Sequence, residues 1–484
     1  MSNSGSTIDA VGKVEQNNLT PIPLSERHGD PKDLFAMWAG SNINYVVLLN
    51  GVLLITLGLG LSQSLFAIII GNLLGCTILG LASLPGPKSG SSMILTSRTS
   101  FGQLAAYLPI FISTISVLGW FSINSVVSTE ALENIFVRTG VKDSHILMWI
   151  CLFLVLIGEI ALAIYGHATI LKTEQWLAAG LGIIFIIFFL FMLPHMDWSY
   201  AGTLKSGTVV STWLIGLGII FSYPLSWTNF ASDYSRYFKP DSDPKKVAFF
   251  AGSGQFAALV VCEVIGVVFA IAAKTALGKI ASDPVSQVGQ LLPTWFVFFF
   301  LIAVVIGGMA TNVPNGYTAG LSLLALRLPL TRVQGVLVIA VFTLAFRIFT
   351  MFYQQFYTLY SNWLSYIIFW TCPWVAIIIV DYFLRKGHYN TIELFKWGKG
   401  GAYWYNGGVL WSGLLSFLVG ILFSFIFMNS SLFVSPLTTR YLGGADLSYF
   451  AGLLVSGLMF YFLARTNGTY REAKEMKSSV LPAE

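Results

Sequence analysis

Charged side chains are scarce in this chain, and their scarcity is the first constraint on what it is. Asp, Glu, Lys and Arg make up 10% of the 484 residues, hydrophobic residues make up 55%, and the mean hydropathy is +0.74. A water-soluble domain of this length could not cover its surface with so few polar groups. The composition therefore excludes a soluble globular protein and indicates that a lipid bilayer is the solvent.

Cysteine and histidine are also few, and their positions argue against cysteine-based and metal-based chemistry. Cys76, Cys151, Cys262 and Cys372 all fall inside apolar stretches, where a thiol behaves as a small hydrophobic group. The sequence has neither a disulfide framework nor a zinc-ligand spacing, and its five histidines are scattered. Paired acidic motifs are missing as well, so we expect no enzyme activity, no metal centre and no cofactor.

A folded domain outside the membrane is not expected either, because most connections between the apolar stretches are short. A membrane-spanning helix needs roughly 20 apolar residues. We therefore predict an all-α polytopic membrane protein of about twelve spans. They lie at residues 36–61, 64–84, 105–128, 145–166, 175–194, 209–231, 247–272, 295–325, 333–352, 360–384, 404–428 and 448–464. This architecture leaves transport, channel activity or intramembrane chemistry as possible functions.

The tails and loops predict the orientation. Residues 1–34 contain no apolar run that would act as a cleavable signal peptide, and Asp30 followed by Pro31 is typical of a helix start. Lys and Arg are concentrated in loops on the amino-terminal side, so both termini are predicted to be cytoplasmic, with the protein in the plasma membrane. The net charge of +5 follows from these dispersed residues, so we expect contact with lipid and none with nucleic acid.

Two predicted spans carry polar and small residues near their middle. Residues 39–44 of the first span read AGSNIN, and residues 222–229 of the sixth read SYPLSWTN. Irregular backbone at membrane depth is tolerated only where it lines a cavity or is packed in protein. Two interruptions five spans apart are what an inverted five-plus-five repeat produces. Ordinary Gly and Pro kinks without a site are the alternative.

Four motifs, in order along the chain, carry a family resemblance. They are GPKSGSSMILTSRTSFG at residues 86–102, GWFSIN at 119–124, SWTNFASDYSRYF at 226–238 and VDYFLRKGHY at 380–389. Together they resemble the purine-cytosine permeases, the nucleobase:cation symporter-1 family, and TNVPNGY at 311–317 resembles the fungal-type branch.

The resemblance implies the fold of the sodium-coupled amino-acid transporters. That fold places two inverted five-helix repeats at about 35–195 and 208–390, within a core at 35–390. Two additional spans follow within 400–465, and residues 1–34 and 466–484 form the tails.

The third predicted span has the residues that a flat heterocycle needs, namely an aromatic platform and an amide at its rim. Trp120 and Asn124 lie one helical turn apart on the same face. A buried amide is costly unless paired, so Asn124 binds either the ligand or a neighbouring helix. The resemblance implies that Trp120 stacks on the substrate; a core Trp beside a helix-bridging Asn is the alternative.

The eighth predicted span offers two more amides. Asn312 and Asn315 flank Pro314, which opens the helical hydrogen-bond ladder and lets side chains turn toward a cavity. An amide donates and accepts at once, which suits the edge of cytosine or a purine. The resemblance places Asn312 on a substrate-binding position; Asn315 is an equally good structural residue.

The residue that covers the second face of the ring is less clear from the sequence. The resemblance places Pro224 where related hydantoin and cytosine transporters have an aromatic residue. Tyr223 or Trp227 is the expected replacement, and each has a helix-interface role as its alternative. Ser41 and Asn42 in the first span are further expected contacts with the same alternative.

The coupling ion is predicted from the oxygen ligands available. In this fold a sodium ion is held by carbonyls of the unwound first span and hydroxyls of the eighth, the ligands that a hard cation prefers. The carbonyls around Ala39 and Asn42, with Thr311, form the possible sodium site. Because Ala310 stands where sodium-dependent relatives have a second hydroxyl, the sequence favours H⁺ over Na⁺.

A proton carrier should be an ionisable group at membrane depth. Glu263 in the seventh predicted span is the carrier we favour, and Glu159 in the fourth and Glu130 in the third also qualify by position, each with a structural partner as the alternative. Asp233 with Arg236, and Asp381 with Arg385, lie where spans six and ten end, spaced to form ion pairs or caps rather than to bind substrate.

These expectations combine into one function. We expect a secondary active symporter that imports a nucleobase, cytosine or a purine, with a cation by alternating access. The alternative is a transporter of the same fold for allantoin or a hydantoin, a nucleoside, a vitamin precursor or an amino acid. A channel would require a repeated filter, which the sequence lacks.

Overall fold

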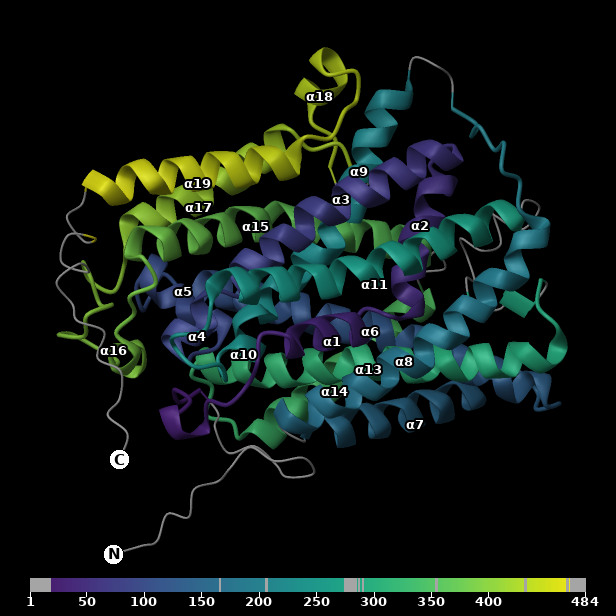
Figure 1. Ribbon diagram of the computed structural model, residues 1–484, viewed down its shortest axis with the longest axis horizontal. Helices are drawn as coiled ribbons and strands as arrows, with labels where there is room; N and C mark the ends of the chain where they lie inside the picture. Colours follow the sequence, from purple (N-terminus) through teal and green to yellow (C-terminus); the bar gives the residue numbers. More distant parts are fainter. Residues whose placement is uncertain are drawn as a thin grey trace, which may run out of the picture.

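The computed structural model describes residues 19–466 and Tyr470, apart from 165–166, 205–207, 274–284, 286–287, 290, 353–355 and 431–432. These residues form helices and isolated β-bridges, with no strand among them. The long helices run side by side along the molecule (Figure 1).

The predicted spans correspond to helices. Among the described residues, eight helices are long and apolar enough to cross a membrane, a bent pair makes a ninth span, and three shorter helices are also apolar. The unbroken spans are α3 (Leu61–Ala82), α6 (Tyr107–Arg138), α7 (His145–Ile164), α8 (His167–Met192), α11 (Pro244–Ala272), α13 (Thr294–Ala325), α14 (Arg332–Phe352), α15 (Phe356–Arg385), α17 (Trp411–Ile426) and α19 (Ser448–Thr466). The prediction of an all-α protein of about twelve spans is confirmed.

The first span is broken. Helix α1 (Asp33–Gly40) and helix α2 (Tyr45–Thr56) meet at an angle of 64°. Asn44 has extended backbone angles, and its side-chain oxygen accepts a hydrogen bond from the Val47 N–H at 3.0 Å, so it caps α2. The interruption predicted at residues 39–44 is therefore present.

The regular part of the first helix begins at Asp33, and Pro31 lies in the turn that leads into it. Asp30 accepts the Lys32 N–H at 2.9 Å and donates its own N–H to the Asp33 carboxylate at 3.0 Å, so it caps this turn as the sequence predicts. Residues 86–102, predicted as a loop, form two short helices, α4 (Pro85–Ser89) and α5 (Met93–Phe101). Both helices are buried, which hydrophobic periodicity over so few residues does not reveal.

The sixth span also changes geometry midway. Helix α9 (Val209–Ser226) continues as a 3₁₀ turn, η4 (Trp227–Phe230), and then as the short helix α10 (Ala231–Ser235). Pro224 lacks an N–H and cannot complete the ladder. The side chains of Ser226, Thr228 and Asn229 donate to the carbonyls three residues earlier, at 2.7, 2.7 and 3.2 Å, which satisfies polar groups at the break.

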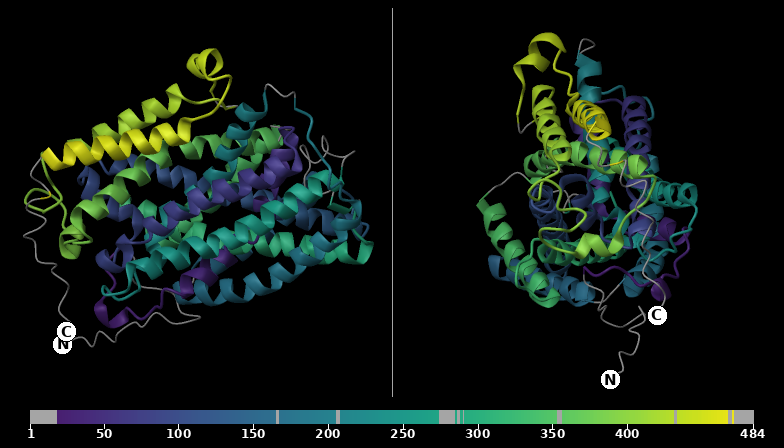
Figure 2. Two further views of the ribbon diagram at one scale, coloured as in Figure 1. Left: turned by 45° about the horizontal axis from the view of Figure 1, so that its top comes forward. Right: turned by 90° about the vertical axis from the view of Figure 1, so that its left-hand side faces the viewer.

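Two packing arrangements position the candidate site. Helix α6 packs along α13, and α11 packs against α2 and α3. Gly51 of α2 and Gly266 of α11 allow the close approach, since a methyl group on either would collide with the backbone of the other helix. The additional helices α17 and α19 pack on α15, at the top of the view in Figure 1. The start of α1 and the end of α19 lie toward the same end of the molecule (Figures 1 and 2).

Candidate substrate site

The aromatic part of the site is built around Trp120 on α6. Its ring lies edge-on to Tyr223 of α9, with 5.1 Å between ring centroids, and edge-on to Tyr360 of α15, at 6.1 Å. All three side chains are buried. An edge-to-face contact of this kind stabilises beyond the area it buries, so the three rings hold one another in place.

The amides predicted from the sequence converge beside this indole. Asn124 donates from Nδ2 to the Trp120 carbonyl at 2.9 Å and to Asn312 Oδ1 at 3.2 Å. Asn315 Nδ2 donates to the same Asn312 oxygen at 3.1 Å. Trp120, Asn124, Asn312 and Asn315 therefore belong to one buried cluster at the contact between α6 and α13.

Glu159 and Ser125, which the sequence did not assign to this cluster, complete it. Asn312 Nδ2 donates to Glu159 Oε1 at 2.9 Å, and Ser125 Oγ donates to Glu159 Oε2 at 2.6 Å. The only sequence signal for Glu159 is an acidic residue in the apolar fourth span, which predicts a proton carrier and not a contact with Asn312. Ser125 had no signal, because its partner lies on another helix.

The cluster leaves one donor and one acceptor unused. Trp120 Nε1 and Asn124 Oδ1 are buried and have no hydrogen-bond partner within the described part of the chain. Leaving such groups unpaired costs roughly 1–3 kcal/mol each, so a polar ligand that pairs them gains affinity. The unused acceptor of Asn124 can pair with an N–H at the edge of a heterocyclic base.

Tyr223 and Trp227, the two expected covers for the ring, have different surroundings. Tyr223 faces Trp120, whereas Trp227 packs against Trp38 and Phe230, with centroids 5.7 and 5.2 Å away. Pro224 faces α3, where it would meet any side chain placed at Gly75. The geometry therefore favours Tyr223 over Trp227 as the ring that covers a substrate.

Ser41 and Asn42, the expected contacts from the first span, lie at its break and are fully buried. Asn42 Nδ2 donates to the Trp38 carbonyl at 2.7 Å, which caps α1, while Asn42 Oδ1 has no partner in the described residues. The Ser41 hydroxyl lies 4.0 Å from Met37 Sδ. Their hydrogen bonds join them to the break itself rather than to the Trp120 cluster.

The Ala39 carbonyl and the Thr311 hydroxyl, which were expected to hold sodium, already have hydrogen-bond partners in the protein. The Ala39 carbonyl accepts the Asn42 N–H at 3.2 Å, and Thr311 Oγ1 lies 3.1 Å from the Ser41 carbonyl. Asn44, which the sequence reading left out of the site, donates from Nδ2 to Thr311 Oγ1 at 2.9 Å. An N–H pointing at that hydroxyl occupies a direction from which a cation would approach.

Glu263 forms a second buried polar centre, on α11. Its two oxygens accept hydrogen bonds from the side-chain amides of Asn50, at 3.0 Å, and Asn72. Asn50 Oδ1 in turn accepts from the hydroxyl of Tyr360, which touches Trp120. Within the described residues, Glu263 forms no salt bridge, so a chain of neutral groups links this carboxyl to the aromatic cluster.

Asp381, Asp233 and Glu130 each have a structural partner. Asp381 and Arg385 form the expected ion pair, with 3.0 Å between Oδ1 and Nε. Asp233 accepts the Met93 N–H at 2.8 Å, which ties the sixth span to α5. Glu130 lies 3.4 Å from Arg347. These contacts hold helices and loops together at the ends of the spans.

A broken first span and a sixth span that tightens into a 3₁₀ turn, beside a buried aromatic and amide cluster, indicate a membrane transporter of the inverted-repeat type. Comparison with solved structures agrees. Mhp1, a nucleobase-cation-symport-1 family transporter in a closed conformation with bromovinylhydantoin bound, superposes with a TM-score of 0.74 at 19% identity, over 97% of this chain and 100% of Mhp1. The predicted five-plus-five fold with two additional helices is thereby confirmed.

Sequence comparison identifies the family. The chain is 28% identical over 480 residues to the putative purine-cytosine permease YxlA of Bacillus subtilis (strain 168), covering 97% of this chain and 100% of that protein. It is 22% identical over 409 residues to the purine-cytosine permease FCY2 of Saccharomyces cerevisiae, covering 79% and 74%. The family model described as permease for cytosine/purines, uracil, thiamine, allantoin matches residues 21–452, so the chain belongs to that permease family.

Proposed function

We propose that this permease imports a purine or pyrimidine base together with a proton, by alternating access around the Trp120 cluster. The observation that carries the proposal is the buried indole of Trp120, one helical turn from an Asn124 amide whose acceptor is unused. The names of the permeases for purines and cytosine that it resembles support the same substrate class. A flat, uncharged ring with a polar edge suits both groups.

Each residue has a distinct role in this proposal. Trp120 stacks on the base, Asn124 binds its edge, and Tyr223 covers the second face. Asn312 holds the Asn124 amide in orientation. A base stacked between two aromatic rings needs roughly 7 Å between the centroids of those rings, because each stacked pair is separated by about one van der Waals thickness. The centroids of the Trp120 and Tyr223 rings are only 5.1 Å apart. Substrate entry therefore requires Tyr223 to move, and its place at the broken sixth span allows that movement.

Four other predicted residues act indirectly. Asn315 orients Asn312 through the hydrogen bond to its Oδ1. Trp227 packs against Trp38 and Phe230 and so braces the sixth span just after Tyr223. Ser41 and Asn42 keep the first span open where it must change shape between states.

Proton coupling is supported over sodium coupling by the contacts of Thr311 and Glu263. Asn44 directs an N–H toward the Thr311 hydroxyl, where a sodium ion would need an oxygen ligand. Glu263 is a buried carboxyl with neutral partners, linked through Asn50 and Tyr360 to Trp120. A carboxyl in such surroundings can gain or lose a proton. The hydrogen bonds through Asn50 and Tyr360 then let the protonation state of Glu263 affect substrate binding at Trp120.

The cellular setting is proposed from the charge pattern. We assign the protein to the plasma membrane with both termini in the cytoplasm, because Lys and Arg are concentrated on that side. The two inverted repeats at about 35–195 and 208–390 would be the parts that move against each other, with residues 400–465 as an addition to that core.

The decisive experiment measures uptake of labelled cytosine, adenine and hypoxanthine by proteoliposomes. Trp120→Ala should abolish saturable uptake, because the stacking platform is lost. Trp295→Ala on α13 is the matched control, since that indole is 60% exposed on the outside of the helix bundle. Normal uptake by Trp120→Ala, at equal reconstitution of both variants, would refute the stacking role.

A hydantoin or allantoin is the second candidate substrate, because the similar Mhp1 structure holds bromovinylhydantoin. Such rings also combine a flat face with an imide edge. Competition against labelled base uptake distinguishes the two: a hydantoin that competes at lower concentration than any nucleobase would replace our assignment.

A further inference from the structure

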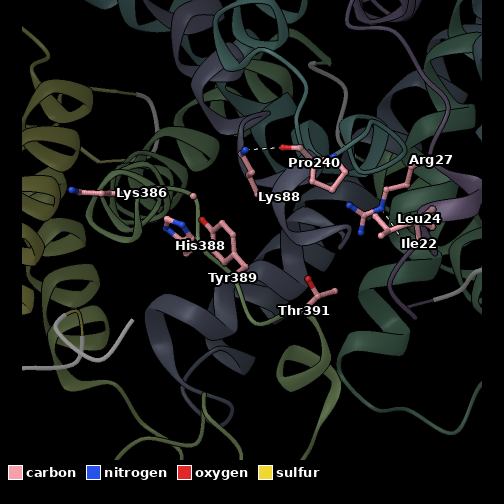
Figure 3. A pocket seen from close by; sticks show the side chains of 10 residues that line it. Ile22, Leu24, Arg27, Lys88, Pro240, Lys386, His388, Tyr389 and Thr391 are labelled. Carbon is pink, nitrogen blue, oxygen red and sulfur yellow. Dashed lines mark hydrogen bonds between the residues drawn. The ribbon is translucent and has the colours of Figure 1, made fainter. Parts of the chain in front are cut away.

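A second candidate site lies near the end of the molecule where α1 begins and α15 ends, away from the Trp120 cluster. It is a pocket of about 150 Å³ formed by four separate chain segments. Residues 22–27 precede α1, Lys88 belongs to α4, Pro240 follows α10, and residues 386–391 follow α15. Figure 3 shows Arg27 and Lys88 approaching the pocket from different segments.

The lining of this pocket is basic. Arg27, Lys88, Lys386 and His388 are among its ten lining residues, and none of the ten is acidic. In Figure 3 the side chain of Lys386 points away from Arg27 and Lys88, so Lys386 lines the pocket without directing its charge into it. Arg27, Lys88 and His388 therefore supply the relevant side chains.

Arg27 is the strongest indication of a ligand. Its side chain is buried, 6% exposed, yet its hydrogen bonds go only to neutral carbonyls, those of Ile22 and Pro87, both at 2.9 Å. Within the described residues, Arg27 forms no salt bridge. Buried charges in proteins are normally paired with an opposite charge. A buried guanidinium without a salt bridge, beside a pocket, therefore indicates that the pocket binds an anion.

The neighbouring groups strengthen that indication. Lys88 Nζ donates to the Pro240 carbonyl at 2.7 Å, and His388 Nδ1 lies 3.0 Å from the Arg385 carbonyl, so these groups also bond to neutral oxygens. Burial and nearby Arg236 lower the pKa of Arg27 to about 10, which leaves it charged at neutral pH. Gly90, with φ +61°, is required here because any side chain would collide with the Arg27 guanidinium.

We propose that this pocket binds a phosphate group, supplied either by free phosphate or by the headgroup of a phospholipid. Its volume equals roughly five waters at liquid density, which suits a tetrahedral oxyanion but not a whole nucleotide. Arginine and lysine are the usual ligands of such anions. A phosphate bound here bridges segments next to spans one, two, six and ten, and so holds these loops together.

The test uses the purified full-length protein in nanodiscs of phosphatidylcholine, with inorganic phosphate added at constant ionic strength. The thermal unfolding temperature should rise saturably with phosphate, because a ligand that binds the folded state stabilises it by mass action. Lys88→Gln and Arg27→Gln should weaken the apparent affinity by about tenfold or more. Lys386→Gln, the matched control, should respond like the unchanged protein.

A second arm separates the two sources of the phosphate group. If a lipid supplies it, nanodiscs containing phosphatidic acid should stabilise the unchanged protein, and Lys88→Gln should remove that effect. Should Arg27→Gln fail to fold, Lys88→Gln and His388→Gln carry the comparison. The proposal is overturned if neither phosphate nor phosphatidic acid stabilises the protein, or if the variants respond as strongly as the unchanged chain.

Discussion

Asn312 uses both ends of its amide within one buried cluster. Its Nδ2 donates to Glu159 and to the Phe121 carbonyl, and its Oδ1 accepts from Asn124 and Asn315. Such a network holds the Asn124 acceptor in one orientation. The affinity for a base should therefore depend on Asn312 through Asn124, whose side chain it holds in place.

We predict that Asn312→Ala raises the KM for base uptake by about tenfold or more, since Asn124, which pairs with the edge of the base, loses the contact that orients it. The measurement is concentration-dependent uptake in proteoliposomes. Asn134→Ala on α6 is the matched control, because that amide bonds to the Glu130 carbonyl of its own helix. An unchanged KM in Asn312→Ala would show that this amide is only structural.

Asp446, in the connection before α19, makes stability depend on pH. Burial raises the pKa of Asp446 to about 6, above the ordinary 3.8. The folded state then holds a proton that the unfolded state has released, so this residue lowers stability as pH rises from about 4 to 6, by roughly 3 kcal/mol at most.

We predict that Asp446→Asn unfolds at a higher temperature than the unchanged protein at pH 7.5, and at the same temperature near pH 4. Asparagine keeps an oxygen for the Ser448 N–H, which Asp446 accepts at 2.9 Å. Thermal unfolding at the two pH values checks the prediction. A variant that is less stable at pH 7.5 would mean that the charged form is favoured in the fold.

Among the elements, the broken first span depends on one residue. Asn44 caps α2 through Val47 and joins the break to α13 through Thr311. Losing a helix cap costs about 1 kcal/mol. Removing the Asn44 side chain also breaks its hydrogen bond to Thr311, so the loss of stability should be larger than for an ordinary cap.

We predict that Asn44→Ala lowers the unfolding temperature and also reduces uptake strongly, because the break loses its link to the eighth span. Asp243→Ala is the matched control: it removes a similar cap, the bond from the Lys245 N–H to Asp243, at the start of α11 and away from the site. Equal losses of stability with equal uptake in both variants would contradict a special role for Asn44.

Local patterns predicted the elements well and the contacts between them poorly. Apolar length located the spans, and the Trp120 to Asn124 spacing placed both on one helix face. The contacts of Asn312 with Glu159 and of Asn44 with Thr311 join residues 153 and 267 positions apart, so no local rule reveals them. The buried helices α4 and α5 escaped detection because tertiary burial, rather than amphipathic periodicity, stabilises such short helices.

At the scale of the whole molecule, hydrogen bonds link two buried carboxyls to the cluster around Trp120. Glu159 touches it through Asn312, and Glu263 reaches it through Asn50 and Tyr360. Glu159 shares its network with the amide that we assign to substrate, whereas Glu263 lies where α11 packs against α2 and α3. In our proposal, Glu159 therefore organises the substrate site and Glu263 carries the proton.

The last prediction concerns coupling in the intact transporter. A protonophore should abolish accumulation of base against its gradient, while replacement of sodium by choline should leave accumulation unchanged. Glu263→Gln keeps a side chain that can bond to Asn50 and Asn72 but cannot carry a proton, so it should retain exchange of labelled for unlabelled base and lose uphill accumulation. Glu133→Gln, on the half-exposed outer end of α6, is the matched control. If Glu263→Gln accumulates base normally, or if removing sodium stops uptake, proton coupling through Glu263 is wrong.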